Sequence, residues 1–171
     1  MPKVSICIPV YNGTNYLAQA IENVLSQSFE DFELLIANDC STDGTQEIID
    51  RYAAQDKRIV SWINEKNLRL FGNYNRCIER AQGEYIKLFA HDDHLSRDAV
   101  ARMYDVFCRQ PEVSLVTCSK RWIDADNKEI EKVVRFKEDV CLKSDDVILA
   151  NLICLNNWIG EPAAVMFRKA H

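Results

Sequence analysis

The chain has 171 residues, of which 47% are hydrophobic and 27% are charged, and its formal net charge is −5 at pH 7. This length and composition fit one globular domain with a full hydrophobic core. The acidic balance argues against a general nucleic-acid binder, which would carry a basic patch and a high isoelectric point.

Short β-branched apolar runs alternate with longer stretches in which apolar residues recur at helical spacing. In chain order they predict a strand at 4–8, a helix at 15–26, a strand at 32–37, a helix at 41–54, a strand at 59–63, a helix at 70–81, a strand at 84–89, a helix at 96–109 and a strand at 113–118. Weaker signals predict strands near 121–123, 133–136 and 163–167, a turn at 126–127 and a helix near 144–151.

This alternating order predicts an α/β fold: a single domain with a Rossmann-like, mostly parallel sheet and helices on both faces. We expect Pro9 to end the first strand, Thr14 and Ser96 to be N-caps, and Gly83 to close the third helix. Ligands of such sheets bind beyond the carboxyl ends of the strands, so the segments after the strands are where chemistry is expected.

We expect neither a signal peptide nor a transmembrane segment. The N-terminus MPKVSICIPVYN has no charged region before a long apolar one, and no apolar run approaches roughly 20 residues. Seven scattered cysteines, such as Cys7 and Cys118 in apolar runs, form no CxxC pair. They indicate reduced core thiols in a cytoplasmic protein rather than a zinc site, and a peripheral place at the inner face of a membrane stays open.

Two segments after strands favour tight turns and leave a ligand role open. In PVYNG, after the first strand, Tyr11 offers a flat ring and Asn12 permits a turn. In NDCSTDGT, after the second strand, Asp39 can accept hydrogen bonds from a base or ribose while Asp43 caps the next helix. Neither GxGxxG nor GxxxxGK[ST] occurs, which excludes the dinucleotide fingerprint and the P-loop.

The stretch AHDDHLS after the fourth strand sets Asp92 beside Asp93, and adjacent carboxylates repel each other. A bound Mg²⁺ or Mn²⁺ would relieve that repulsion and bridge to phosphate oxygens. Alternatively, Asp93 and Ser96 cap the helix that follows. His91 and His94 are further candidate ligands, although a surface histidine is the commoner outcome.

Taken together, these segments resemble the family 2 glycosyltransferases of the GT-A fold. The resemblance rests on VSICIPVYN, on NDCSTDGT beside the family's vDDgStDgT, and on NLRLFGNYNRCIERAQGEYIKLFAHDD beside n.G...a.N.gi..A.GeYi.flDaDD. It runs from about Val4 to Val116, and WIGEPAAVMFRKA loosely resembles a later segment ending in F-R-[RK]. Each piece is weak alone, but the ordered set is specific.

The resemblance implies transfer of a sugar from a nucleotide-diphospho-sugar, usually a UDP-sugar, to an acceptor hydroxyl, with inversion, in cell-surface polysaccharide synthesis. It implies a Mg²⁺ or Mn²⁺ cofactor and a saccharide or lipid-linked acceptor, and leaves homo-oligomer formation open. The residues implied to bind nucleotide are Pro9, Tyr11, Asn12, Asp39 (to the base), Asn67, Asn73, Asn75 and Asp92, and those implied to hold the metal are Asp92 and Asp93.

The chain also departs from the family pattern. Ala90 stands where the metal motif has its first acid, and Asn38 stands where the family has Asp. The family's catalytic base lies downstream of the F-R-[RK] segment, whereas this chain ends at His171, so Glu161 is the nearest catalytic candidate. We therefore expect residues 1–171 to be a GT-A-like nucleotide-sugar-binding domain truncated at its C-terminus.

Two alternatives stay in view. A non-catalytic nucleotide-sugar-binding module, or an inactive fragment, would bind the donor without transfer because the base is missing. A nucleotidyltransferase would need a basic, glycine-rich loop after the first strand, and PVYNGTNY contains no Lys or Arg. The sequence leaves the sugar, the acceptor and the linkage open.

Overall fold

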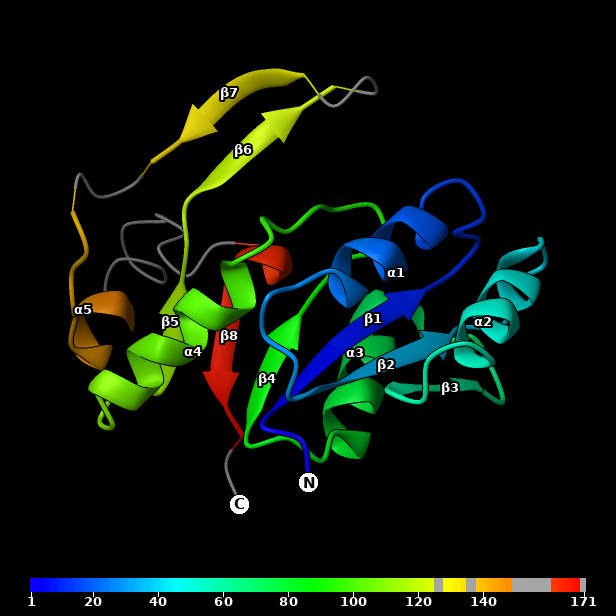
Figure 1. The fold of residues 1–171 in the computed structure, drawn as a ribbon, viewed down its shortest axis with the longest axis horizontal. Helices are drawn as coiled ribbons and strands as arrows, with labels where there is room; N and C mark the ends of the chain where they lie inside the picture. Colours follow the sequence, from blue (N-terminus) through cyan, green and yellow to red (C-terminus); the bar gives the residue numbers. More distant parts are fainter. Residues whose placement is uncertain (125–127, 135–137, 149–160, 170–171) are drawn as a thin grey trace.

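The computed structural model describes residues 1–124, 128–134, 138–148 and 161–169. Figure 1 shows an open sheet with helices packed on it and a two-stranded hairpin apart from it. The elements are, in order, β1 (Val4–Val10), α1 (Leu17–Leu25), β2 (Phe32–Asn38), α2 (Thr45–Ala53), β3 (Ile59–Ile63), α3 (Arg69–Arg80), β4 (Tyr85–Leu88), α4 (Ala99–Arg109), β5 (Leu115–Thr117), β6 (Lys120–Ile123), β7 (Glu129–Val133), α5 (Ser144–Ile148) and β8 (Val165–Arg168). No helix in the described ranges is long and apolar enough to cross a membrane.

The main sheet has the strand order β3-β2-β1-β4-β8-β5. β1 pairs in parallel with β2 and β4, and β2 pairs in parallel with β3, which confirms the predicted α/β class. β8 lies between β4 and β5 and pairs antiparallel with both. The alternating pattern gave no sign of this insertion, because β8 comes from a distant part of the chain.

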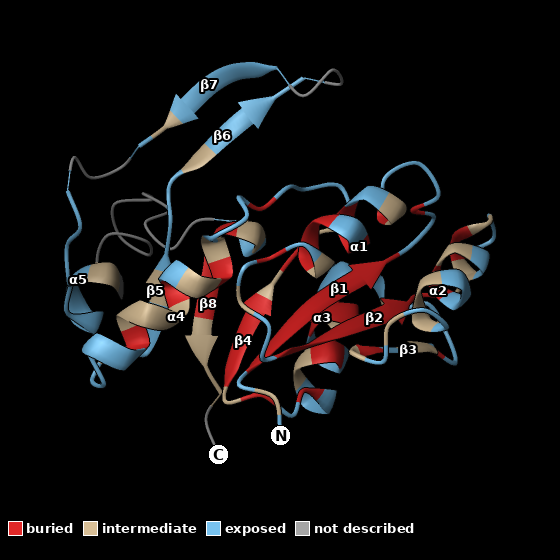
Figure 2. Ribbon diagram, viewed as in Figure 1, coloured by how far each residue is buried: buried red, intermediate tan, exposed pale blue. Residues whose placement is uncertain are grey.

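Helices cover both faces of the sheet, as predicted. Successive residues of a strand point to opposite faces, and in β1 Ile6 and Ile8 pack with α1, α2 and α4, whereas Cys7 packs with α3. Burying each such aliphatic side chain stabilises the fold by about 1.5–3 kcal/mol. Figure 2 shows β1, β2 and β4 buried and the β6–β7 hairpin largely exposed, so the strands that lead to the site are covered on both faces and the hairpin is not.

β1 continues through Pro9 to Val10, so the predicted stop at Pro9 is wrong. The N–H of Asp39 donates to the carbonyl of Val10, which directs Val10 toward β2 and therefore Pro9 toward β4. The β1–β4 ladder ends at the Cys7–Leu88 pair. The missing N–H of Pro9 thus removes no bond from that ladder.

The side-chain N-caps predicted at Thr14 and Ser96 are also wrong. α1 begins after Tyr16, and the hydroxyl of Thr14 donates instead to Asp43 in the loop after β2. α4 begins after Asp98, and the hydroxyl of Ser96 donates to the Asp98 carboxylate at 3.1 Å instead of accepting a hydrogen bond from a helix N–H. In each case the helix begins later than predicted, so the hydroxyl residue does not occupy the N-cap position.

Gly83 is required by close packing rather than by a helix end. α3 ends at Arg80 and its cap residue is Ala81. A Cβ at position 83 would lie 2.6 Å from the backbone nitrogen of Ser5 in β1, and the Gly83 N–H donates to the Ser5 hydroxyl at 2.8 Å. The glycine therefore lets the turn before β4 lie directly against β1.

The region after β5 departs most from prediction. β7 ends at Val133, where the strand 133–136 was expected to begin. The sequence of β7, EIEKV, has too many charged residues to be predicted as a strand. β7 pairs with β6, and Arg121 and Glu129 form an ion pair at 3.1 Å. The turn expected at 126–127 and the end of the helix expected at 144–151 lie outside the described residues.

Cysteines occur as free thiols both in the core and on the surface. Cys7 and Cys77 are buried, as predicted for core thiols. Cys108, Cys118 and Cys141 are exposed, so the core prediction is wrong for Cys118. Cys118 follows β5, which among the described strands is the edge strand of the sheet.

Candidate active site at the carboxyl edge of the sheet

The segments after β1, β2 and β3 interlock at the carboxyl edge of the sheet. We call them the loop edge: residues 11–13, 39–45 and 64–69. The Asn12 N–H donates to the Ser41 hydroxyl at 2.9 Å, and the Asn12 side-chain oxygen accepts from the Thr42 N–H at 2.9 Å. The Gly13 N–H donates to the Thr45 hydroxyl at 2.8 Å. The turn predicted in PVYNG is thus fixed by the neighbouring loop.

Asp39 is the buried anchor of the loop edge, with 2% of its surface exposed. Its Oδ1 accepts hydrogen bonds from the Leu68 N–H and the Asn64 amide, both at 2.8 Å. Its Oδ2 accepts one from the Arg69 N–H at 2.8 Å. These backbone donors belong to the start of α3, so the carboxylate pairs N–H groups that a helix leaves open and lies at the positive end of the helix dipole.

Asn64 belongs to this network and was missed by the sequence analysis. It is buried, donates to Asp39 and to the Asn73 side-chain oxygen at 2.8 Å each, and accepts the Trp62 indole N–H at 3.0 Å. Asn73 in turn donates to the Ala37 carbonyl at 2.8 Å. The available signal was an asparagine directly after an apolar strand, where a buried amide must find partners.

The other residues expected near a nucleotide lie in or beside the loop edge, but they differ in exposure and contacts. Asn67 joins the loop edge by donating to the Asp39 carbonyl at 3.1 Å. Tyr11 extends beyond β1 with 49% of its surface exposed, while Pro9 is buried within the strand. Asn75 lines a cavity of about 460 Å³ between β3 and α3 together with the loop-edge residues Asn64 and Leu68. It lies on a different side of α3 from the buried Asn73.

Among the described residues, three that are not glycine take a left-handed backbone, and all lie in the loop edge: Asn12 (φ 53°), Cys40 (φ 62°) and Arg69 (φ 62°). Asn tolerates this conformation, whereas a longer side chain pays roughly 1–2 kcal/mol for it. The family pattern has glycine at the positions of Cys40 and Arg69. Cys40 and Arg69 thus keep the left-handed backbone conformation although neither is a glycine. The glycines of the family pattern could have predicted this conformation from the sequence.

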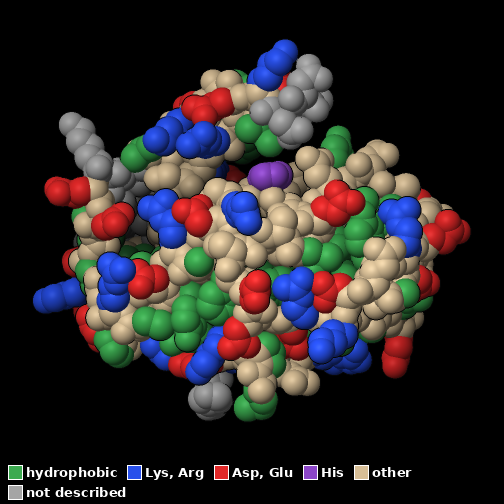
Figure 3. Space-filling model, in the orientation of Figure 1, with side chains coloured by type: hydrophobic (Ala, Val, Ile, Leu, Met, Phe, Trp, Pro, Cys, Tyr) green, Lys and Arg blue, Asp and Glu red, His purple; other side chains and the backbone are tan. Residues whose placement is uncertain are grey.

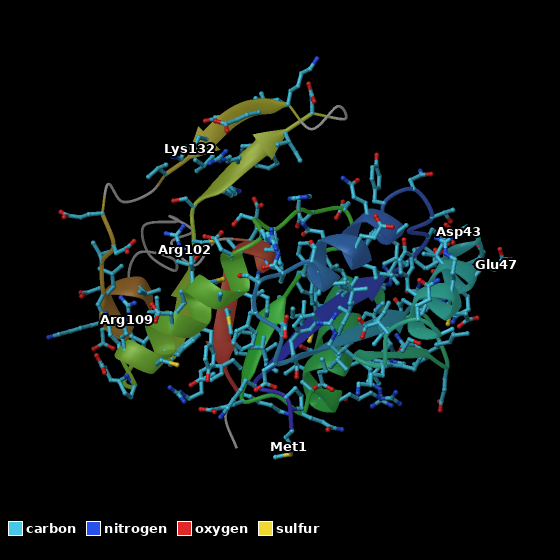
Figure 4. All side chains as sticks on the ribbon, in the orientation of Figure 1. Met1, Asp43, Glu47, Arg102, Arg109 and Lys132 are labelled. Carbon is cyan, nitrogen blue, oxygen red and sulfur yellow. The ribbon has the colours of Figure 1, made fainter. Side chains whose placement is uncertain are left out.

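Asp43 closes the loop edge one residue before Gly44, which is the cap residue of α2, so the predicted side-chain N-cap at Asp43 is wrong, although Asp43 still bonds to the first residue of the helix. Its carboxylate accepts a hydrogen bond from the Thr14 hydroxyl and one from the Thr45 N–H at 3.0 Å. Hydrogen bonds from the Thr14 hydroxyl first, and from Thr45 second, hold the pKa of the Asp43 carboxyl well below its usual value. Figure 4 shows Asp43 and Glu47 at the same end of α2, where negative charge suits the helix dipole.

Asp92 and Asp93 follow β4 at the same edge of the sheet. A Cβ at Gly13 would lie 3.0 Å from the ring of His91, so this segment packs directly against the loop edge. Asp93 is an exposed residue, yet partial burial of its carboxyl group, and then the negative charges of Asp92 and Glu161, raise its pKa. We call Asp92, Asp93 and Glu161 the acid edge, because their charges act on one another.

The alternative interpretations of AHDDHLS receive little support. The residue at the cap position of α4 is Asp98, so Asp93 does not cap that helix. The side-chain amide of Asn23 on α1 donates a hydrogen bond to the Nε2 atom of His94 at 3.1 Å, so this ring nitrogen already has a protein partner.

Two lysines that the sequence analysis did not single out flank the acid edge. Lys120, at the start of β6, forms an ion pair with Glu161. Lys87 in β4 is fully buried, and its ammonium donates to the carbonyls of Leu88 and Ala163. Burial lowers the pKa of Lys87 to about 8. Lys87 therefore ties the turn after Glu161 to the end of β4, and its signal was a lone lysine in the apolar run EYIKLF.

The acid pair suits a divalent cation that a substrate helps to hold. Within the described ranges, no three Asp, Glu, His or Cys side chains converge on one point. Mg²⁺ and similar hard ions are commonly bound by one or two carboxylates together with substrate phosphates. Asp92 and Asp93 supply such oxygens, and a cation would remove the repulsion that contributes to the raised pKa of Asp93.

Comparisons with known proteins identify the family of the chain. The Glycosyl transferase family 2 model matches residues 5–170. A Bacillus subtilis protein named as a teichuronic acid biosynthesis glycosyltransferase, TuaG, is 30% identical over 161 residues, which are 94% of this chain and 63% of the relative. The chondroitin synthase of Escherichia coli is 34% identical over 130 residues, 76% of this chain and 19% of the synthase. The chain thus spans less than two thirds of the length of these relatives.

Solved structures share the fold. TarS 1–349 of S. aureus, in complex with UDP-GlcNAc, has a TM-score of 0.77 and 20% identity, over 98% of this chain and 46% of that one. The mannosyltransferase PcManGT from Pyrobaculum calidifontis, in complex with GDP-Man and Mn²⁺, has a TM-score of 0.65 and 23% identity, over 70% of this chain and 36% of that one. With the family match over nearly its whole length, the chain belongs to glycosyl transferase family 2.

Proposed function

We propose that this site moves a sugar from a nucleotide-diphospho-sugar, with UDP as the nucleotide, to an acceptor hydroxyl, with inversion and with a divalent cation. The observation that carries the proposal is the order of polar groups along the sheet edge. The loop edge follows β1, β2 and β3, and the acid pair follows β4, the next strand in the sheet. A nucleoside on the loop edge would present its diphosphate to the acid pair.

The loop edge supports nucleoside binding because its groups are fixed beforehand. Tyr11 offers an exposed ring, and Asn12 is held by the loop after β2. The Oδ2 atom of Asp39 accepts one bond from Arg69, and a carboxylate oxygen can accept a second, such as one from a base N–H. Groups held in place before binding lose little entropy when a ligand arrives.

The acid edge supports the transfer step. We assign Asp92 and Asp93 to a Mg²⁺ or Mn²⁺ ion, which when bound stabilises the charge of a departing diphosphate. Inversion also needs a carboxylate that takes the proton of the acceptor hydroxyl. Glu161 is the acid that the described structure brings beside the pair, and its ion pair with Lys120 orients it.

Cell-surface polysaccharide synthesis is the setting we propose. One relative is named for teichuronic acid biosynthesis and another for chondroitin synthesis, and both names concern polysaccharides. The acceptor would then be a saccharide, free or lipid-linked, met at the inner face of the membrane.

Isothermal titration of the 171-residue chain tests the donor site. UDP is expected to bind with a dissociation constant between about 1 µM and 1 mM, more tightly with Mn²⁺ than without it. GDP, titrated in parallel, is expected to bind more weakly. Asp92→Asn should lose the Mn²⁺ effect, and Asp98→Asn, the same change at the exposed start of α4, should keep it. No heat from UDP at millimolar concentration in either condition contradicts the proposal.

A second candidate is a module that binds the donor without transferring its sugar. The ion pair between Glu161 and Lys120 favours it, because a paired carboxylate is a weaker base. Release of UDP from UDP-sugars by this chain, with a saccharide acceptor present, distinguishes the two. Release that Glu161→Gln abolishes supports transfer, and tight UDP binding without any release supports the module.

A further inference from the structure

The β6–β7 hairpin stands over the acid edge. It lies on the side of the body toward which the arrow of β4 points (Figure 1). Figure 3 shows a histidine in the hollow beneath it, and both described histidines belong to the segment between β4 and α4. The Lys120–Glu161 ion pair joins the hairpin to this site.

Trp122 lies on the face of the hairpin that looks onto the site. Residues two apart in a strand share a face, so Trp122 points to the same side as Lys120, which contacts Glu161. Arg121 points the opposite way and pairs with Glu129 at 3.1 Å. The irregularity in the β6–β7 pairing begins only after Trp122, so the alternation holds up to it.

The exposed indole of Trp122 has the chemistry of a sugar-binding surface. The Lys120 ammonium lies 4.5 Å from the ring centroid, and 48% of the Trp122 surface is still exposed. A flat apolar ring thus lies beside an ammonium and the carboxylate of Glu161. A pyranose matches this combination, because its C–H face packs on a ring while its hydroxyls bond to charged groups.

We infer that this hairpin face, formed by Trp122 and Lys120, binds a sugar ring of the acceptor saccharide. The inference rests on the proposed function. Along the sheet, the loop edge covers β3, β2 and β1, the acid pair follows β4, Glu161 precedes β8, and the hairpin follows β5. With the nucleoside at one end and its phosphates at the acid pair, the attacking hydroxyl arrives from the other end, where the hairpin stands.

NMR of the whole chain with ¹⁵N-labelled indoles tests the inference. Three methyl glycosides, of β-D-glucose, β-D-galactose and N-acetyl-β-D-glucosamine, are added to about 50 mM with UDP and Mg²⁺ present, because contacts of this size give millimolar dissociation constants. The Trp122 signal, assigned by its loss in Trp122→Phe, is expected to shift with at least one glycoside and not with glycerol. The signal of Trp62, whose N–H donates to Asn64 at 3.0 Å, is expected to stay.

Variants separate stacking from hairpin folding. The affinity for the responding glycoside, measured by saturation transfer, is expected to fall about tenfold in Trp122→Ala and to stay within about threefold in Trp122→Phe, which keeps a ring. Arg121→Ala, on the opposite face of the same strand, is the matched control and should leave glycoside affinity unchanged. UDP affinity should be unchanged in all three variants.

Each contrary outcome is distinct. An unmoved Trp122 signal with all three glycosides, in a protein that binds UDP, overturns the inference and leaves the proposed function standing. A shift with UDP alone places nucleotide at the hairpin and also overturns the inference. A glycoside response in a chain that does not bind UDP removes the proposed function and the acceptor role with it. Equal losses in Arg121→Ala and Trp122→Ala would show that only hairpin folding matters.

Discussion

The loop edge and the acid edge are neighbours on one sheet, but their carboxylates have opposite surroundings. At the loop edge, the buried carboxylate of Asp39 accepts three hydrogen bonds from within the protein. At the acid edge, Asp92, Asp93 and Glu161 gather negative charge, and the pKa of Asp93 rises in response. The carboxylate of the first edge is paired within the protein, whereas the second edge leaves carboxylates for which we propose a bound cation as partner.

Substitution of Asp39 is expected to have the largest effect, because it breaks the edge whose carboxylate is already paired. Asp39→Asn turns one acceptor oxygen into a donor that faces backbone N–H groups at the start of α3. We expect the free energy of unfolding, measured in urea, to fall by about 3 kcal/mol. Asp31→Asn makes the same change at an exposed residue and should cost less than about 0.5 kcal/mol. Similar small losses in both variants would mean that the network does not hold the loop edge.

At the acid edge the same substitution is expected to act on binding and not on folding. Asp93→Asn removes a like charge from beside Asp92, so the free energy of unfolding should hold or rise by less than about 1 kcal/mol. UDP affinity in Mn²⁺ should fall on the order of 100-fold, since losing a charged partner costs about 2–3 kcal/mol. Calorimetry and urea unfolding measure both quantities, with Asp98→Asn as control. A loss of stability as large as that of Asp39→Asn would contradict the prediction that Asp93 contributes to binding and not to folding.

The order of the first four strands and their helices could be predicted because each is a local pattern of apolar residues. The place of β8 could not, since its pairing with β4 and β5 depends on contacts between distant segments. Pro9 and Gly83 show a related limit. Residue propensities predict that Pro9 and Gly83 end a strand and a helix. The direction of the Pro9 nitrogen and the closeness of Gly83 to Ser5 depend instead on how neighbouring strands pack, which propensities do not describe.

The candidate site was predictable in its positions but not in its partners. Asp39 and the acid pair stand after strands and Asn73 stands within the third helix, where the sequence placed them. Their hydrogen bonds run through Asn64, which belongs to no motif in the pattern. The lysines at the acid edge could not be placed either, because their roles depend on Glu161 coming to β4 from a distant part of the chain.

A smaller effect, of opposite sign, is expected at Arg69. This residue holds φ 62° where the family pattern has glycine. Arg69→Gly keeps the backbone N–H that donates to Asp39 and relieves the left-handed strain, so the free energy of unfolding should rise by about 0.5–1 kcal/mol. Arg76→Gly, within α3, should instead lower it by about 1 kcal/mol. Loss of stability in both would mean that the Arg69 side chain contributes more than its backbone costs.

The smallest effect is expected from Asp43, which is exposed and ties Thr14 to the start of α2. Its pKa in the folded chain lies below the unfolded value of about 3.9, so its contribution to stability is present above pH ~4 and is lost as the pH falls through the folded pKa. The melting temperatures of the wild type and Asp43→Asn, followed by circular dichroism, should therefore differ at neutral pH and converge in acid. Thr14→Val should reproduce the neutral-pH loss and add little to Asp43→Asn, because both remove the same hydrogen bond. A constant difference at every pH would mean that the Asp43 charge does not tie Thr14 to α2.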